Sequence, residues 1–132
     1  MEEYYVELEV RDYELDMHGI VNDSVYVQYL EHGRHKFLDH IGANFELMAE
    51  KDIFFTNAQT TVKYKLPLRG GETFRVTTSI ARQGKIRFIF NQKVINSEGK
   101  ICVEAEVIGV CLNKKGRPFA PDEIVELVEK NL

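Results

Sequence analysis

The segment SVYVQYLEHGRHKFLDHIG, residues 24–42, decides the fold of this 132-residue chain. Its apolar and small residues recur at steps of mostly three and four, the spacing of one face of an α-helix. They are Tyr26, Tyr29, Leu30, Gly33, Phe37, Leu38 and Ile41. Gly42 comes directly after them, where a glycine commonly ends a helix. The sequence therefore predicts one long helix with a continuous apolar face.

Gly33 lies within that apolar face. A glycine inside a helix costs ~1 kcal/mol relative to alanine. We therefore expect a compensating close approach between the helix and a sheet at this position.

The remaining chain alternates with the two-residue period of β-strands. Residues 5–11 place Val6, Leu8 and Val10 on one face of a first strand. Four further alternating segments are TTVKYKL (60–66), ETFRVTTSIA (72–81), KIRFIFNQKVI (85–95) and KICVEAEVIGVCL (100–112). Short turns containing Gly, Asn and Lys separate them, which favours antiparallel hairpins in a meander. Shorter helices are expected over residues 44–51 and 121–132.

One long helix with a single apolar face needs one sheet face to cover it. The element order therefore predicts an α+β hotdog fold, in which a curved antiparallel β-sheet wraps around a long central α-helix. No linker or repeat interrupts the chain, so residues 1–132 are expected to form a single domain.

Composition narrows the functional classes. The net charge is −4, with −9 in residues 1–50 and +5 in residues 51–132. A globally acidic chain is a poor nucleic-acid binder. The basic second part of the chain could bind a phosphorylated cofactor or an acidic carrier protein, or it could simply be a solvated surface. No apolar run could span a membrane and the N-terminus does not read as a signal peptide, so a cytoplasmic protein is expected.

The two cysteines give no sign of a disulfide or a metal site. Cys102 and Cys111 lie an odd number of positions apart in one expected strand, which would place them on opposite faces. Buried free thiols are expected. His32, His35 and Asp39 share one side of the helix, but no supporting ligand cluster exists elsewhere, so a solvated or interface surface is favoured over metal.

The loop DMHGIVND, residues 16–23, precedes the long helix and is rich in polar groups. Asp16 could be only a turn residue, or it could direct a carboxylate at a reacting group. Gly19 would allow a tight turn and close substrate approach. Asn22, Asp23 or Ser24 could cap the helix.

The segment DMHGIVNDSVYVQYLEHGR resembles the loop signature of the 4-hydroxybenzoyl-CoA thioesterase-like hotdog family. YKLPLRGGE, EGK and KKGRPFAP agree with that family in order and spacing, and VRDYELD and HGRH resemble most closely the plant plastid single-hotdog acyl-ACP thioesterases. The resemblance covers essentially the whole chain. It implies hydrolysis of an acyl-CoA or acyl-ACP thioester by a homodimer or by a homotetramer built from two dimers.

The resemblance also implies roles for the loop residues. Asp16 would be the nucleophile or general base, and amides of the loop and of the helix start, including that of Asp23, would polarise the thioester carbonyl. Some bacterial relatives have a histidine at the position of Asp23, so a mechanism that needs it is in doubt here. Asn22 and Asp23 are expected mainly as helix caps, and His18 mainly as a polar loop residue. Glu31 would support the site or pair with Arg34.

Candidate substrate contacts are drawn from two groups. Tyr26 and Tyr29, with the strand aromatics Phe88 and Phe90, are expected to line the acyl chain at a subunit boundary. The candidates for the phosphates of CoA or for an acidic carrier helix are Lys63, Lys65, Arg69, Arg82, Lys85, Arg87 and Arg117.

Three other functions compete with acyl thioester hydrolysis. An aryl-CoA or dihydroxynaphthoyl-CoA thioesterase would be favoured by a pocket with a polar end. A non-catalytic acyl-binding module would not need Asp16. A hotdog dehydratase would need a well-placed histidine beside an acid. Thioester hydrolysis is expected to need neither a metal nor a redox cofactor, because CoA or phosphopantetheine enters only as part of the substrate.

Overall fold

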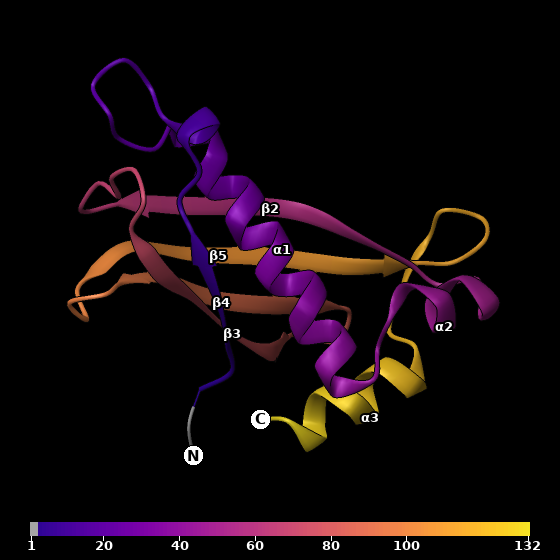
Figure 1. Cartoon of the computed structure of the whole chain (residues 1–132). Coiled ribbons are helices and arrows are strands. Elements are labelled where there is room, and N and C mark those ends of the chain that lie inside the picture. The colour runs from indigo at the N-terminus through magenta and orange to yellow at the C-terminus, as the bar shows by residue number, and fades with distance from the viewer. Residues whose placement is uncertain (1–2) are drawn as a thin grey trace.

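A computed structural model describes residues 3–132, in which one long helix lies across a curved antiparallel sheet (Figure 1). The strands are β1 (Tyr5–Glu9), β2 (Phe54–Tyr64), β3 (Thr73–Gln83), β4 (Arg87–Asn96), β5 (Ile101–Leu112) and β6 (Pro118–Phe119). The helices are a short 3-10 turn η1 (Asp12–Glu14), α1 (Asp23–Ile41), α2 (Phe45–Glu50) and α3 (Asp122–Lys130). The predicted α+β hotdog architecture is confirmed.

Helix α1 is the centre of the core, as its pattern predicts. All seven residues of the apolar face are buried. The first half of the helix packs in a cluster with Phe74 and Val103, and the second half packs in a cluster with Phe88 and Val128. Gly42 ends the helix with a φ of 94°, and its N–H donates to the Asp39 carbonyl at 3.1 Å.

The predicted close approach at Gly33 is confirmed. A Cβ atom at this position would lie 2.7 Å from Val76 Cγ1 on β3 and 3.2 Å from Gln92 Nε2 on β4. Real Cβ atoms essentially never come as close to another heavy atom as the first of these distances. The glycine therefore lets the helix axis sit against the sheet.

We expect Gly33→Ala to destabilise the protein by about 1–3 kcal/mol, the usual range for overpacking. Alanine would favour the helix by ~1 kcal/mol, but the clash with Val76 outweighs that gain. Urea denaturation of the variant would measure the difference, with the exposed α1 substitution His32→Ala as its control. A Gly33→Ala protein as stable as the wild type would contradict the close packing.

The strand order is β1-β3-β4-β5-β2, with β6 beside β5. The hairpins β3–β4 and β4–β5 are confirmed, but the hairpin expected between β2 and β3 is wrong, because these strands are not neighbours. The segment between them leaves the sheet edge and runs over the start of α1. Leu68 is fully buried there, and its carbonyl accepts from the Val21 N–H at 3.0 Å.

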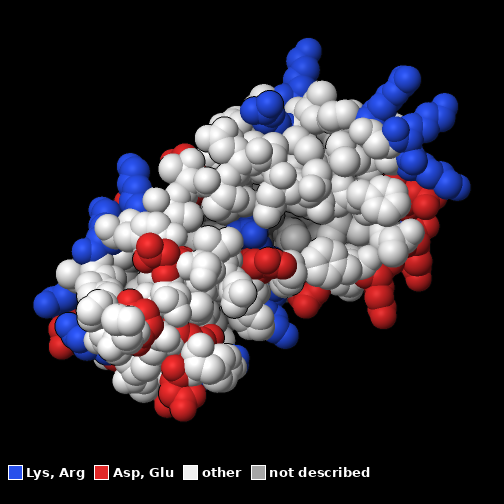
Figure 2. Space-filling model, turned by 90° about the horizontal axis from the view of Figure 1, so that it is seen from above, with Lys and Arg blue, Asp and Glu red and all other residues white. Residues whose placement is uncertain are grey.

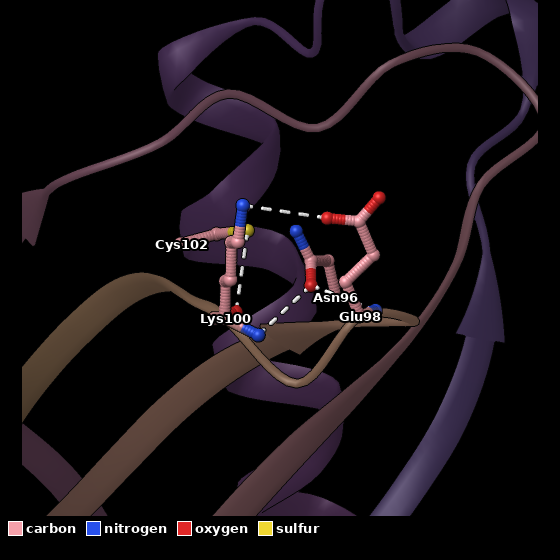
Figure 3. A network of polar contacts seen from close by, with 4 residues as sticks. All are labelled: Asn96, Glu98, Lys100 and Cys102. Carbon is pink, nitrogen blue, oxygen red and sulfur yellow. Dashed lines mark hydrogen bonds and ion pairs between the residues drawn. The ribbon is translucent and has the colours of Figure 1, made fainter.

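The β4–β5 turn explains the polar cluster of Figure 3. The Asn96 side-chain oxygen accepts from the N–H groups of Glu98 and Lys100, at 3.0 and 2.9 Å, and the Lys100 ammonium lies 3.5 Å from the Glu98 carboxylate. The Cys102 thiol donates to the Lys100 carbonyl at 3.8 Å. These contacts close the hairpin.

Cys102 and Cys111 are both buried and free, as expected. Their predicted placement on opposite faces is wrong. The β4–β5 register shifts beside Cys102, since Val94 pairs with Val103 whereas Ile95 pairs with Ile101. This irregularity lets Cys102 and Val103 both reach the core.

Candidate active site

Residues 15–21 form a small closed loop in front of α1. Leu15 and Val21 form an isolated antiparallel bridge at its base, and Ile20 forms another with Arg69. The Asp16 N–H donates to the Ile20 carbonyl at 2.8 Å, and Gly19, with a φ of 76°, donates to the Asp16 carbonyl at 3.1 Å. The loop therefore has a defined shape, and the tight turn expected at Gly19 is observed.

The half-buried Asp16 carboxylate has two different oxygens. Oδ1 accepts from the N–H groups of His18 and Ile20, at 2.8 and 3.3 Å. Oδ2 accepts no hydrogen bond from residues 3–132 in this structure. One oxygen thus builds the turn while the other stays available for chemistry, so the turn and the reactive interpretations of Asp16 are compatible.

The start of α1 lacks the side-chain cap that the sequence led us to expect. Asn22 occupies the N-cap position, but its side chain makes no capping hydrogen bond. Instead its Nδ2 donates to the Glu14 carbonyl at 3.4 Å, and its backbone N–H donates to the same oxygen at 3.0 Å. The capping prediction is wrong because Glu14 draws Asn22 away from the helix end.

The uncapped end leaves backbone donors open. The Asp23 and Ser24 N–H groups lie in the first turn of α1, so the helix has no carbonyl four residues earlier to accept from them. They have no hydrogen-bond partner among the described backbone and side-chain contacts. They also lie at the positive end of the helix dipole. Asp16 lies on the loop that leads into these two donors at the start of α1, and acyl transfer requires a charge-stabilising site beside a nucleophile or base.

Glu14 is a residue that the sequence interpretation missed. It is buried, and its carboxylate oxygen accepts from the Tyr29 hydroxyl at 2.7 Å and from the Arg11 N–H at 2.8 Å. Burial and the Glu14 carboxylate raise the pKa of Tyr29, so its hydroxyl remains a donor. The signal for Glu14 was a charged residue directly before an apolar one at the entrance to the loop.

We expect Tyr29→Phe to lower the free energy of unfolding by about 1.5–3 kcal/mol, because a buried carboxylate would lose a hydrogen bond. Chemical denaturation would measure the loss. Tyr64→Phe is the matched control, since its exposed hydroxyl donates to the Asp23 carbonyl at 3.2 Å and should matter less. Equal stabilities for both variants would contradict a positioning role for the Glu14–Tyr29 pair.

The aromatic residues expected to line the acyl chain are closed into the core of the single chain. Tyr26 and Tyr29 are buried, and the Tyr26 hydroxyl accepts from the Leu68 N–H at 2.9 Å. Phe88 and Phe90 are also buried. Tyr26, Tyr29 and Phe88 are part of the packed core, whereas Phe90 also lines a small cavity beside Leu38 and Phe55.

The basic candidates are spread over both ends of the molecule. Arg69 lies beside the loop through its bridge to Ile20. Arg82 lies 3.8 Å from Glu129 of α3, and its guanidinium also donates to the Lys85 carbonyl. Arg87 begins β4 next to that turn, and Arg117 precedes β6. Within one chain, the structure therefore brings only Arg69 of the four arginines to the Asp16 loop.

The distribution of charge over the β2 side of the molecule is uneven. Figure 2 looks down on this side, where Lys and Arg side chains lie at both ends and uncharged atoms cover much of the middle. Lys63 and Lys65 lie near the Tyr64 end of β2, and the Lys65 ammonium is 3.2 Å from the Glu104 carboxylate. Lys63 lines a cavity with Glu104 and Glu106, whereas Arg69 is bridged to Ile20 of the loop.

The polar helix residues do not form a metal site. Among residues 3–132, no group of three or more His, Cys, Asp or Glu side chains could hold an ion.

Glu31 pairs with His35 at 3.6 Å, so its expected pairing with Arg34 is not found. Arg34 instead turns inward and donates to Gln92 Oε1 at 3.0 Å. His18 is exposed in the loop, and only its backbone contacts Asp16.

Two cavities formed by residues 3–132 lie against the sheet. One, of about 360 Å³, is lined largely by charged and polar residues including Lys63, Lys93 and Glu104. The other, of about 240 Å³, lies between α1, α2 and β2. Its lining residues are Glu31, Arg34, His35, Leu38, Phe45, Phe55, Thr56, Asn57 and Phe90.

No helix within residues 3–132 is long and apolar enough to cross a membrane.

Comparison with known proteins decides the family. The family model of the thioesterase-like superfamily matches residues 10–129, which include the loop, α1 and all of the sheet beyond β1. The chain belongs to this superfamily.

Relatives of known name agree with the thioesterase-like superfamily assignment. Over 122 residues the chain is 41% identical to "Acyl-acyl carrier protein thioesterase ATL3, chloroplastic" of Arabidopsis thaliana, covering 89% of this chain and 63% of the relative. This chain therefore spans less than two thirds of that plant protein. It is also 30% identical over 112 residues to "Acyl-CoA thioester hydrolase YbgC" of Escherichia coli O157:H7, covering 83% of this chain and 84% of that protein.

A solved structure confirms the fold of this superfamily member. The DHNA-CoA thioesterase of Staphylococcus aureus superimposes with a TM-score of 0.86 at 20% sequence identity, over 96% of this chain and 88% of that one. At this identity the likeness concerns the arrangement of helix and sheet.

Proposed function

We propose that the protein hydrolyses acyl thioesters of coenzyme A or of an acyl carrier protein, releasing a carboxylic acid and a thiol. The observation that carries the proposal is the free Oδ2 of Asp16 on the loop that leads into the open Asp23 and Ser24 amides at the start of α1. Membership of the thioesterase-like superfamily supports this interpretation.

Two routes use the same residues. In the first, Asp16 attacks the thioester carbon, the C–S bond breaks and the thiolate leaves, and water then hydrolyses the mixed anhydride to restore Asp16. In the second, Asp16 takes a proton from water, the hydroxide oxygen adds to the carbon, and the departing thiolate recovers that proton. In both, the Asp23 and Ser24 N–H groups stabilise the negative carbonyl oxygen.

The names of relatives support two kinds of thiol carrier. The plant relative is named for acyl carrier protein and the bacterial one for acyl-CoA. Arg69, which is bridged to Ile20 of the loop, would meet either the phosphates of CoA or an acidic carrier helix. The structural neighbour named for DHNA-CoA keeps an aryl thioester as the second candidate substrate.

Thiol release from a panel of acyl-CoAs, aryl-CoAs and acyl carrier protein thioesters tests the proposed activity. Turnover of at least one of these thioesters, and not of the corresponding oxygen esters, is the expected result. The substrate with the highest kcat/KM identifies the acyl group and the carrier. Binding of every acyl compound without any turnover would instead favour an acyl-binding module.

Self-association is the second part of the proposal, and the exposed β2 edge supports it. Strand β2 has eleven residues, pairs with β5 on one side only, and has nine exposed residues. Phe54 and Tyr64, at its two ends, are 53% and 50% exposed. An unprotected edge strand of this length is a template for pairing with another strand. We expect two protomers to pair β2 against β2 about a two-fold axis, with a homotetramer formed from two such dimers.

The cellular location is proposed as the cytoplasm, with the substrate as the only small-molecule partner and with neither a metal nor a redox cofactor. The plant relative is named as chloroplastic, so a plastid is the competing location for a protein of this family. Imaging the natural protein with a C-terminal fluorescent tag would distinguish the two.

A further inference from the structure

Arg34 is the one buried cation of α1 that the proposed chemistry does not use. It is 5% exposed, follows Gly33 on the inner side of the helix, and lines the cavity between α1, α2 and β2. One guanidinium nitrogen donates to Gln92 Oε1 at 3.0 Å. Gln92 is itself held by the Leu30 carbonyl and the Thr78 hydroxyl, at 2.9 and 3.0 Å. Arg34 is therefore oriented by a buried neutral network.

The charge of Arg34 has no counter-ion in the described structure. Among residues 3–132, no carboxylate lies within 4.0 Å of its guanidinium. Burial lowers the pKa of Arg34, and Glu31 partly opposes that shift, but an arginine stays protonated in proteins. A buried charge is costly unless it is paired, and a guanidinium has five N–H donors that fit a carboxylate in a two-pronged contact.

The groups that face Arg34 define what the cavity would accept. Phe90 and Phe55 provide aromatic walls, and the Phe55 ring is itself held against Gly109 and Phe88. Glu31 and His35 lie at the cavity and pair with each other, while the His35 ring packs edge-on against Phe45 at 4.8 Å. The cavity thus combines apolar walls with one buried cation, as expected for an acyl group that carries an oxygen function.

The position of the cavity relates it to the reacting loop of a second protomer. The cavity contains residues of the first half of β2, namely Phe55, Thr56 and Asn57. Tyr64 ends the same strand, and its hydroxyl donates a hydrogen bond to the Asp23 carbonyl. When two β2 strands pair antiparallel, the first half of one lies beside the end of the other. The cavity of one protomer would then face the Asp16 loop of its partner.

We propose that this cavity receives the acyl group of the substrate, and that Arg34 selects acyl groups bearing a second, distal oxygen acceptor, a carboxylate above all, over plain hydrocarbon chains. The inference rests on the proposed thioester hydrolysis and names the substrate class of that site. Phe55 and Phe90 contact the carbon chain, and the guanidinium binds the distal oxygen.

The test compares CoA thioesters matched in length whose distal end is a methyl, a hydroxymethyl or a carboxylate group. We expect the wild type to prefer the carboxylate end over the methyl end by at least about 10-fold in kcat/KM, the size of one charge-assisted hydrogen bond. Arg34→Met should abolish that preference, so that the carboxylate-ended and methyl-ended thioesters are hydrolysed with similar kcat/KM. Arg34→Lys should keep part of the preference, because lysine retains the positive charge but lacks the two parallel N–H donors of a guanidinium.

Two further variants separate selection from folding. Lys36→Met removes an exposed charge two residues away on α1 and should leave the preference unchanged. Asn57→Asp keeps Arg34 but adds a nearly isosteric carboxylate to the cavity lining, and should reduce the preference by about 10-fold. This variant decides the question if Arg34→Met does not fold. Equal loss on all three thioesters, loss of the dimer in Arg34→Met, or a wild type that prefers the methyl end would overturn the proposal.

A second readout does not depend on turnover. Calorimetric titration with a free dicarboxylate and with the monocarboxylate of equal length measures the distal contact directly. Tighter dicarboxylate binding that Arg34→Met abolishes would support the role of Arg34 even if no thioester were hydrolysed, a result that would overturn the proposed function alone. Equal binding of both acids by the wild type would overturn the role of Arg34 whatever the enzyme's activity.

Discussion

Asp16→Asn is expected to lower kcat by about 10²-fold or more on the best thioester of the panel, because asparagine neither attacks the carbon nor takes a proton from water. The turn should survive this change. The Asn Oδ1 atom can still accept from the His18 and Ile20 N–H groups, which Asp16 binds at 2.8 and 3.3 Å. Steady-state thiol release, with circular dichroism to confirm folding, measures the effect.

The matched control is Asp12→Asn, in the exposed 3-10 turn that precedes the loop. It removes one acidic charge from the same region and should leave kcat within a factor of two or so, as expected for an exposed substitution away from the site. If Asp16→Asn and Asp12→Asn had equal rates, Asp16 would be a turn residue only. The mixed-anhydride route would be supported over the water route if single-turnover hydrolysis in ¹⁸O water placed the label in Asp16.

Thr60→Lys is expected to weaken the proposed dimer by about 10²-fold. Thr60 is exposed near the middle of β2, so a two-fold axis through this edge brings the two introduced ammonium groups of a dimer close together. Facing like charges cost several kcal/mol at an interface, and lysine is a residue that natural proteins use to protect sheet edges. Sedimentation velocity over a concentration series would measure the shift to monomer.

A loss of activity should accompany the loss of the dimer if the cavity of one protomer serves the Asp16 loop of the other. Gln83→Lys, at the exposed end of β3 and away from the β2 edge, is the control and should change neither association nor rate. A monomeric Thr60→Lys protein with full activity would show that one chain holds a complete site. A dimer as stable as the wild type would place the interface elsewhere.

The local periodicity of the sequence determined the elements themselves. The three- and four-residue spacing from Tyr26 to Ile41 specifies a helix with one buried face, and Gly42 ends it. Alternation specifies β3, β4 and β5, and the short turns between them leave antiparallel hairpins as the available connection. The loop with Asp16 and Gly19 was also recognisable, because its turn is made by residues at most four positions apart.

Contacts between distant segments were decided only by the tertiary structure. Local turn chemistry favoured a β2–β3 hairpin, but burial of Leu68 beneath Tyr26 carries the chain across the start of α1 and places β2 at the opposite edge. Asn22 has the chemistry of a cap, yet Glu14, eight residues earlier, takes its side chain. Arg34 follows the spacing of the buried face, but the sequence suggested for it only a pairing with Glu31. The buried position of Arg34 depends on its hydrogen bond to Gln92 of β4, which is 58 residues away in the sequence. Local sequence patterns cannot predict a partner at that separation.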